Sequence, residues 1–334
     1  MSLHDVIIVG AGPVGLAAAI AAKARGLDYV VLEKGALVNS IYHFPTNMVF
    51  FTTPELLEIG GLPLVSPFEK PTRLEALRYY RRVADTFKLK IEMDVRVCAV
   101  RTEPDAESER FAVDTERADG TRGVRCARAV VLAIGYYDHP NMLGIPGEDL
   151  PHVAHYYREA HPFYRKRVVV VGGANSAAEA ALELHRAGAH VTLVHRRETF
   201  NKNMKYWVLP DLQNRIKDGA FPAFLGYQVV EIQRHCVVIR RDGDTEEIPA
   251  DAVFVLTGYR TDVGLLRSAG VHIDPCTAMP EHDPETFETN VRNLFVAGGT
   301  ISGDNAVPIF IENGRFHGEK VVSEIARRLG KADG

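Results

Sequence analysis

The stretch VIIVGAGPVGLAAAI, residues 6–20, decides the fold of this chain. Residues 6–10 are a short apolar run that ends at a glycine turn, and the alanine-rich residues 17–25 favour a helix. A second apolar run follows at residues 29–32. The order strand, turn, helix, strand predicts a βαβ unit, the building block of doubly wound sheets.

An export signal or a membrane span is the alternative interpretation of this apolar run. Residues 6–22 are a little short for a bilayer, which needs about 20 apolar residues. His4 and Asp5 stand where a signal peptide would carry positive charge, and glycines interrupt the run early. We therefore expect a cytoplasmic protein without a membrane-spanning segment.

The same βαβ pattern recurs in the second half of the chain. Residues 167–171 and 190–195 are apolar runs, and residues 176–187 between them favour a helix. In both halves a series of alternating β segments follows, and then an apolar strand that ends in Gly-Tyr, at Gly135-Tyr136 and at Gly258-Tyr259. The shared plan predicts an α/β fold with two Rossmann-like nucleotide-binding domains.

The first glycine loop fits the pattern G-x-G-x-x-G at Gly10, Gly12 and Gly15. The first glycine permits the tight turn, the second lets the backbone approach a pyrophosphate, and the third lets helix and strand pack closely. Glu33 ends the second strand, where a carboxylate accepts hydrogen bonds from both ribose hydroxyls and repels a 2′-phosphate. The loop therefore predicts a site for FAD or NAD rather than NADP, and a tight turn without a ligand is the alternative.

The second glycine loop, residues 172–177, is a degenerate form of the same motif. Its second strand ends at His195-Arg196-Arg197 instead of an acidic residue. Guanidinium groups at this place suit a 2′-phosphate, so NADPH is the preferred ligand and a solvated basic strand end is the alternative. An acidic and a basic ribose site in one chain predict an oxidoreductase that transfers electrons between NADPH and FAD.

Composition excludes several other classes of protein. Of the 334 residues 46% are hydrophobic and 25% charged, and the net charge of −4 gives no electrostatic case for nucleic acid or an anionic membrane as partner. The four cysteines are far apart, without a CxxC or a zinc pattern, so we expect reduced thiols and no metal site. A homodimer is the default expectation for a soluble oligomer.

These motifs resemble the thioredoxin-reductase-like flavoproteins and, more closely, the bacillithiol disulfide reductase family. The matching segments span nearly the whole chain: GAGPVGLAAAI at 10–20, EKG at 33–35, SIYHFPTNMVFFTT at 40–53, IGYYDHPNMLGIPGEDLP at 134–151, HYYREAHPFY at 155–164, VVVVGGANSAAEAALEL at 168–184, VFVLTGY at 253–259, ETFETNVRNLFVAGG at 285–299 and IFIENGRFHG at 309–318.

The resemblance implies an FAD domain built from residues 1–152 and 284–334, with an NADPH domain, residues 153–283, inserted between them. It implies an FAD site of Gly10, Gly12, Pro13, Val14, Gly15, Glu33, Lys34, Tyr42, Thr46, Asn47, Gly135, Gly298 and Ile309. It implies an NADPH site of Gly172, Asn175, Ser176, His195, Arg196 and Arg197. The expected acceptor is a low-molecular-weight disulfide such as bacillithiol disulfide, or a redox carrier protein.

Three departures from the family's pattern bear on the chemistry. Thioredoxin reductases carry a CxxC just before the second glycine loop, and residues 155–167 contain no cysteine. Some members of the bacillithiol family have a cysteine at the position of Val14, and a valine cannot form a mixed disulfide. The loop that usually offers an aspartate to the ribityl chain of FAD reads Ala297-Gly298-Gly299, so that contact is missing. Reduced flavin would then act on the acceptor directly, because no catalytic residue is predicted.

Three other functions remain as alternatives. A reductase of ferredoxin, flavodoxin or quinone needs no protein thiol, a flavin monooxygenase would form a hydroperoxyflavin, and a redox sensor would bind FAD that NADPH does not reduce. His317, near the C-terminus, could protonate reduced flavin or a thiolate, but a surface histidine is the preferred interpretation.

Overall fold

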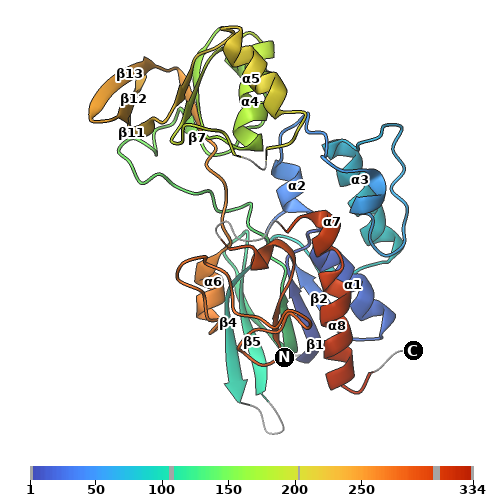
Figure 1. Ribbon diagram of the computed structural model, residues 1–334. Helices are drawn as coiled ribbons and strands as arrows, with labels where there is room; N and C mark the ends of the chain where they lie inside the picture. The colour runs from blue at the N-terminus through green and yellow to red at the C-terminus, as the bar shows by residue number, and fades with distance from the viewer. Residues whose placement is uncertain (1–2, 105–108, 202–203, 304–308, 332–334) are drawn as a thin grey trace. The chain divides into compact units, whose positions relative to one another are not determined.

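The computed structural model describes residues 3–104, 109–201, 204–303 and 309–331 (Figure 1). The chain divides into two compact units. Unit 1 comprises Met1–His43, Met48–His139 and Tyr259–Gly334, and unit 2 comprises Phe44–Asn47 and Pro140–Gly258.

The large sheet of unit 1 combines both ends of the chain. Its strands lie in the order β3-β2-β1-β6-β5-β4, and β15 pairs with the part of β6 that also pairs with β1. The strands are β1 (Leu3–Val9), β2 (Tyr29–Leu32), β3 (Ile91–Glu92), β4 (Val95–Pro104), β5 (Glu109–Arg117), β6 (Arg122–Leu132) and β15 (Leu294–Val296). The pairs of β1 with β2 and β6 are parallel, and β4, β5 and β6 form an antiparallel meander. The parallel part confirms the first predicted βαβ unit.

Helices pack against both the parallel part and the meander of this sheet. Unit 1 contains α1 (Pro13–Ala24), α2 (Asn39–His43), α3 (Arg73–Thr86), α6 (Val263–Ser268), α7 (Ile311–Gly314) and α8 (His317–Arg328), with short 3-10 turns η1 (Pro54–Leu57) and η3 (Gly298–Ile301). Figure 1 shows α1 and α8 side by side. Gly318 makes this close packing possible, because a Cβ atom there would lie 2.5 Å from the backbone nitrogen of Ala18.

Unit 2 is a second α/β sandwich. Its parallel sheet has the order β10-β9-β8-β14-β7, and a separate antiparallel sheet has the order β11-β12-β13. The elements are β7 (Val153–Ala154), η2 (His161–Phe163), β8 (Arg167–Val171), α4 (Asn175–Arg186), β9 (His190–His195), α5 (Leu209–Lys217), β10 (Ala223–Leu225), β11 (Gln228–Ile232), β12 (Cys236–Arg241), β13 (Asp244–Pro249) and β14 (Ala252–Val255). One core cluster joins α4 and α5 to the parallel sheet, and another joins the two sheets.

The borders of the compact units differ from the domain borders expected after residues 152 and 283. Leu143, Ile145 and Leu150 pack on the core between the two sheets of unit 2, so the chain enters this unit after His139. At the other border α6 lies against β4 of unit 1, so the chain leaves unit 2 after Gly258. Both differences concern segments whose apolar residues show no helix or strand periodicity, residues 140–152 and 259–283. Their place depends on tertiary packing.

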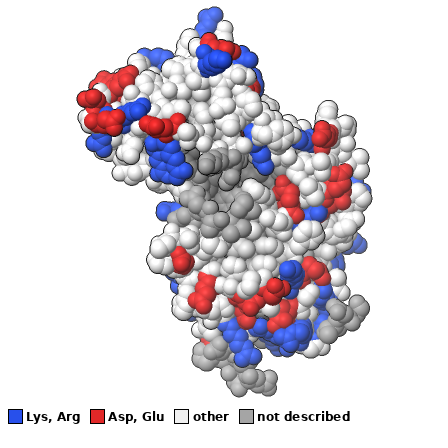
Figure 2. Space-filling view, viewed as in Figure 1, with Lys and Arg blue, Asp and Glu red and all other residues white. Residues whose placement is uncertain are grey.

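Charges are mixed on the face drawn in Figure 2, where basic and acidic side chains intermingle over the sheet β11-β12-β13 and over the meander end of unit 1. Among the described residues, none of the helices has the length and apolar character that crossing a bilayer requires.

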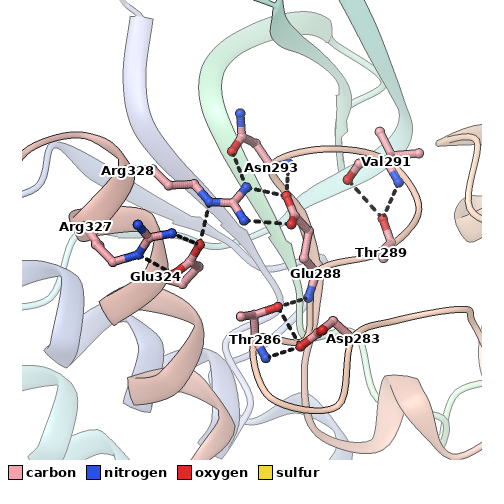
Figure 3. Close-up of polar contacts among 9 residues, drawn as sticks. All are labelled: Asp283, Thr286, Glu288, Thr289, Val291, Asn293, Glu324, Arg327 and Arg328. Carbon is pink, nitrogen blue, oxygen red and sulfur yellow. Dashed lines mark hydrogen bonds and ion pairs between the residues drawn. The ribbon is translucent and has the colours of Figure 1, made fainter.

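A polar network attaches the last helix, α8, to residues 283–293 of the same unit (Figure 3). The guanidinium of Arg328 forms a bidentate ion pair with Glu288, with Nη2 2.7 Å from Oε2, and also contacts Glu324 Oε1 at 2.6 Å and Asn293 Oδ1 at 3.0 Å. Asp283 fixes the loop that carries Glu288, because its Oδ1 accepts bonds from the backbone nitrogen of Thr286 at 2.8 Å and from the Thr286 hydroxyl at 3.0 Å. The network therefore joins two segments far apart in sequence.

We predict that Arg328→Ala lowers the free energy of unfolding by about 2–3 kcal/mol, since it leaves the half-buried Glu288 carboxylate without its main partner. Urea denaturation near neutral pH measures this. The interaction holds the pKa of Glu288 below its usual 4.5, with burial opposing the Arg328 bond. The pair's contribution is therefore complete above pH 4.5 and is lost as the pH falls through the lower folded pKa. Arg327→Ala is the control: Arg327 is exposed, so an equal loss would refute the role of the network.

Candidate functional site

The first glycine loop connects β1 to α1 and has the shape of a phosphate cradle. A Cβ atom on Gly10 would lie 2.5 Å from the carbonyl oxygen of Ala133, and one on Gly15 would lie 1.9 Å from that of Gly10. Packing of the protein itself thus requires these two glycines. A Cβ on Gly12 would meet no described atom within 4 Å, and the backbone there is extended, so packing does not account for this glycine, whereas a ligand that approaches the loop does.

The first turn of α1 can donate hydrogen bonds to such a ligand. Gly12 is the N-cap, has no side chain to cap the helix, and is followed by Pro13 at the first helical position. The N–H groups of the first turn therefore point to the open space beside Gly12, and the helix dipole favours an anion there. This arrangement fits the pyrophosphate of a dinucleotide.

Glu33 stands at the end of β2, beside this loop. Its Oε2 accepts a bond from the backbone nitrogen of Ala11 at 2.7 Å, and Oε1 accepts one from Gly35 at 3.0 Å. Burial raises the pKa of the carboxyl group, and the two N–H donors act in the opposite direction. Each oxygen keeps a lone pair for a ribose hydroxyl, so the residue fits its expected role. Lys34 forms an ion pair with Asp138 at 2.9 Å.

The ends of β6 and β15 meet next to Val14. Gly298 follows β15 in the left-handed conformation, and a Cβ there would lie 2.7 Å from Cγ2 of Val14. The backbone nitrogen of Gly135 donates to Thr300 Oγ1 at 3.2 Å, so the turn after β6 is tied to η3. Ile309 is buried, and its Cγ2 would lie 3.1 Å from a Cβ on Gly314. The structure thus brings Val14, Gly135, Gly298 and Ile309 together within unit 1.

His317 is buried rather than on the surface, so the preferred sequence interpretation was wrong. The side chain is 9% exposed, its ring stacks on Phe287 with centroids 4.2 Å apart, and its Nδ1 accepts a bond from the backbone nitrogen of Gly298 at 3.2 Å. Burial, then the charge of Lys320, lowers the pKa of His317 to about 4. Near neutral pH the ring is therefore neutral, with its proton on Nε2, and it positions the Gly298 backbone.

We predict an acid-sensitive contribution of His317 to stability. Since folding lowers its pKa from 6.5 to about 4, the unfolded chain binds more protons between these values, and stability falls as the pH drops through them. The loss is roughly 3 kcal/mol by pH 4. Urea melts from pH 7 to pH 4 should show a smaller decline for His317→Gln than for the natural protein. His190→Gln, at an exposed position, is the control, and equal pH profiles for the natural protein and His317→Gln would contradict this assignment.

Tyr42, Thr46 and Asn47 are divided between the two units. Tyr42 is exposed on α2, and its ring centroid lies 5.7 Å from the guanidinium carbon of Arg73. Thr46 and Asn47 belong to the unit that holds the second glycine loop, where the Thr46 backbone nitrogen donates to Arg158 at 2.8 Å and the Asn47 amide donates to Glu183 at 3.3 Å. Their expected place beside the flavin stays a prediction.

Helix α4 carries an acidic pair that sequence reasoning missed. Glu179 and Glu183 are one turn apart, and burial, then the charge of Glu183, raises the pKa of Glu179 to about 7. The signal was present in the sequence, because two acidic residues four positions apart interrupt an otherwise alanine- and leucine-rich helix.

The second glycine loop joins β8 to α4. A Cβ on Gly172 would lie 2.5 Å from the carbonyl oxygen of Leu256, so packing requires this glycine. The imidazole of His195 covers the next position, since a Cβ on Gly173 would lie 2.2 Å from its Cε1, and the ring stacks on Phe200 with centroids 6.1 Å apart. Its Nε2 is buried without a hydrogen-bond partner among the described residues. A polar atom of this kind beside a glycine loop fits a ligand that carries phosphate.

The predicted 2′-phosphate residues lie next to this loop. Arg196 and Arg197 are exposed, and no ion pair of theirs is found within the described part of the chain. Both charges lower the pKa of His195, after the larger effect of burial. Asn175 Oδ1 accepts a bond from the backbone nitrogen of Lys205 at 2.9 Å, and Ser176 is exposed in the first turn of α4. Exposed basic side chains thus lie at the place where a second nucleotide is expected.

Comparison with known proteins identifies the family. Residues 7–298 match the family described as pyridine nucleotide-disulphide oxidoreductase. The chain belongs to this family. It is 43% identical to the bacilliredoxin reductase Bdr of Bacillus subtilis over 98% of this chain and 99% of that one. The structure of the bacillithiol disulfide reductase Bdr from Bacillus cereus superposes with a TM-score of 0.94 at 42% identity and covers 98% of this chain and all of that one.

A more distant relative is a ferredoxin–NADP reductase of Ignicoccus hospitalis, which is 26% identical over 89% of this chain and 90% of that one. The comparisons confirm the predicted resemblance, the two-domain α/β fold and the class of FAD-dependent oxidoreductase. FAD and NADPH, the predicted cofactors, are those of this family, and both glycine loops fit them.

Proposed function

We propose that this protein oxidises NADPH and reduces a disulfide that contains bacillithiol, either bacillithiol disulfide or a bacilliredoxin in mixed disulfide with bacillithiol. The proposal places FAD in unit 1 and NADPH in unit 2. The main support for this function is the similarity over nearly the whole length of the Bdr relatives. The opposite charges at Glu33 and at Arg196-Arg197 support the placement of the two nucleotides. We further propose a cytoplasmic homo-oligomer.

The residues would hold the cofactors rather than take part in covalent steps. Glu33 would orient the adenosine ribose, the Gly10–Gly15 loop would bind the pyrophosphate, and Arg196 and Arg197 would bind the 2′-phosphate of NADPH. Bound FAD supplies two-electron chemistry between NADPH and the disulfide. In total, NADPH and one proton reduce one disulfide to two thiols and leave NADP⁺. His317, neutral near pH 7, would keep the Gly298 backbone in place.

The deciding experiment follows NADPH consumption by the purified yellow protein at low oxygen. We expect rapid turnover with bacillithiol disulfide or with the bacilliredoxin mixed disulfide, and little without an acceptor. A protein that passes electrons to ferredoxin but ignores both disulfides would overturn the proposal. Reduction of ferredoxin is the second function to test beside disulfide reduction. The ferredoxin–NADP reductase relative and the valine at position 14 are the reasons.

We predict that thiol alkylation leaves turnover unchanged. Cys98 and Cys276 are exposed, Cys236 is half-buried and Cys126 is buried, and none of them lies in either glycine loop. Burial, then the charge of Glu116, raises the pKa of Cys98, which weakens it as a nucleophile. Iodoacetamide treatment before the assay should change the rate by less than about twofold. A large loss, abolished by Cys276→Ser or Cys98→Ser, would instead reveal a protein thiol in the pathway.

A further inference from the structure

Gly299 is a glycine because of Tyr136. A Cβ atom on Gly299 would lie 2.7 Å from Cδ1 and 2.9 Å from Cε1 of the Tyr136 ring. The φ angle of Gly299 is outside the left-handed region, so its backbone admits any residue. The ring of Tyr136 thus occupies the space that a side chain at position 299 would take, so a side chain there would require the ring to move.

This position lies on the edge of the sheet where a dinucleotide is expected. Glu33 follows β2, the first glycine loop follows β1, Tyr136 comes after β6, and Gly299 comes after β15, in the order in which these strands pair. Nucleotides lie across the carboxyl ends of such strands. With the adenosine at Glu33 and the pyrophosphate at the loop, the flavin-bearing half of FAD extends toward Tyr136 and Gly299.

The surroundings of Tyr136 are fixed by backbone contacts. Thr300 is completely buried, its hydroxyl oxygen accepts from the backbone nitrogen of Gly135 at 3.2 Å, and its carbonyl accepts from the Thr261 hydroxyl at 3.3 Å. On the other side, the Gly298 backbone nitrogen donates to His317. The residues before and after Gly299 are therefore held in place before a ligand arrives.

The phenol of Tyr136 is suited to donate a hydrogen bond. Burial, then the negative charge of Glu312, raises its pKa, so the hydroxyl keeps its proton. Within the described ranges no protein acceptor is found for it, whereas the neighbouring Tyr137 hydroxyl donates to the carbonyl of His43 at 3.3 Å. Tyr136 can therefore offer its proton to a hydroxyl-rich ligand.

We propose that Tyr136 binds the ribityl chain of FAD in place of a side chain at position 299, donating its phenol hydroxyl to the chain. This inference rests on the proposed FAD site of unit 1. It assigns to Tyr136 the ribityl contact that is missing in the Ala297-Gly298-Gly299 loop, and it implies that side chains at positions 136 and 299 compete for one space.

Titration of the apoproteins with FAD, followed by flavin fluorescence, tests the proposal. We expect Tyr136→Phe to raise the Kd about three- to tenfold, because one hydrogen bond is lost. Tyr136→Ala should raise it further. Gly299→Asp should also weaken binding, since its side chain clashes with the ring, but Gly299→Asp combined with Tyr136→Ala should bind FAD more tightly than either single variant.

Tyr137→Phe is the matched control, because the Tyr137 hydroxyl already has an acceptor in the protein. Its Kd should stay within about twofold of the natural protein. Urea melts of each apoprotein separate lost binding from lost folding. An unchanged Kd for both Tyr136 variants, or a double variant that is weaker than both singles, would overturn the inference while leaving the proposed function intact. A natural protein that does not bind FAD would overturn both.

Discussion

Replacing Gly12 with alanine should leave the apoprotein as stable as the natural one and weaken FAD binding roughly 10- to 100-fold. The added methyl group meets no protein atom within 4 Å, and a φ of −72° suits alanine, so folding has no reason to change. The open space beside Gly12 is where the pyrophosphate must approach, and overpacking by one methyl group costs about 1–3 kcal/mol. FAD titration and urea denaturation of the apoprotein measure the two effects separately.

Gly15→Ala provides the contrast. Its methyl group would lie 1.9 Å from the carbonyl oxygen of Gly10, so strand β1 and helix α1 must separate. Both stability and FAD binding should decline. If Gly12→Ala bound FAD as tightly as the natural protein, the ligand would not reach the start of α1, and the assignment of the pyrophosphate to this loop would be wrong.

The two βαβ units could be predicted because their signals are local. The strand predicted at residues 167–171 is β8, and the helix predicted at 176–187 is α4, displaced by one residue at each end. Apolar periodicity and glycine turns need no knowledge of distant residues. The glycine loops could be identified for the same reason, whereas the unit borders could not, since they depend on how residues 140–152 and 259–283 pack.

Several site features were missed although a sequence signal existed. His317, Val321 and Ile325 recur every four residues, which places the histidine on the buried face of α8. The same spacing of Glu179 and Glu183 on α4 indicated an acidic pair. In contrast, nothing in the sequence indicated that the ring of His195 would cover Gly173, because this contact depends on how the folded chain packs His195, whose ring stacks on Phe200.

A turn motif that occurs twice in the sequence was also not predicted. The sequence Asp-Pro-x-Thr occurs at residues 274–277 and again at 283–286. In both turns the aspartate Oδ1 accepts bonds from the backbone nitrogens of the two residues after the proline and from the threonine hydroxyl. Such side-chain to backbone bonds are predictable from the residue types. The second turn holds the loop that carries Glu288, so the missed repeat contributes to how the last helix is attached.

The double variant Arg196→Ala/Arg197→Ala should lower kcat/KM for NADPH roughly 100-fold and leave kcat/KM for NADH within about threefold. Both guanidinium groups are exposed beside the second glycine loop, and no ion pair of theirs is found among the described residues. A hydrogen bond between charged partners contributes about 1.5–3 kcal/mol, and solvent screening at this exposed site reduces the sum of two. NADH lacks the 2′-phosphate, so the substitutions remove no comparable hydrogen bonds to NADH.

The test depends on the ratio of kcat/KM for NADPH to kcat/KM for NADH. A loss of activity alone has many causes. Arg234→Ala is the matched control, since it removes an exposed arginine of unit 2 at the turn between β11 and β12. It should leave both nucleotides unaffected. Raising the salt concentration should weaken NADPH binding to the natural protein and have little effect on the double variant. Equal losses for NADPH and NADH in the double variant would mean that Arg196 and Arg197 support the loop itself. The 2′-phosphate would then have to be bound elsewhere, and the electrostatic contrast with Glu33 would no longer assign the two nucleotides to their units.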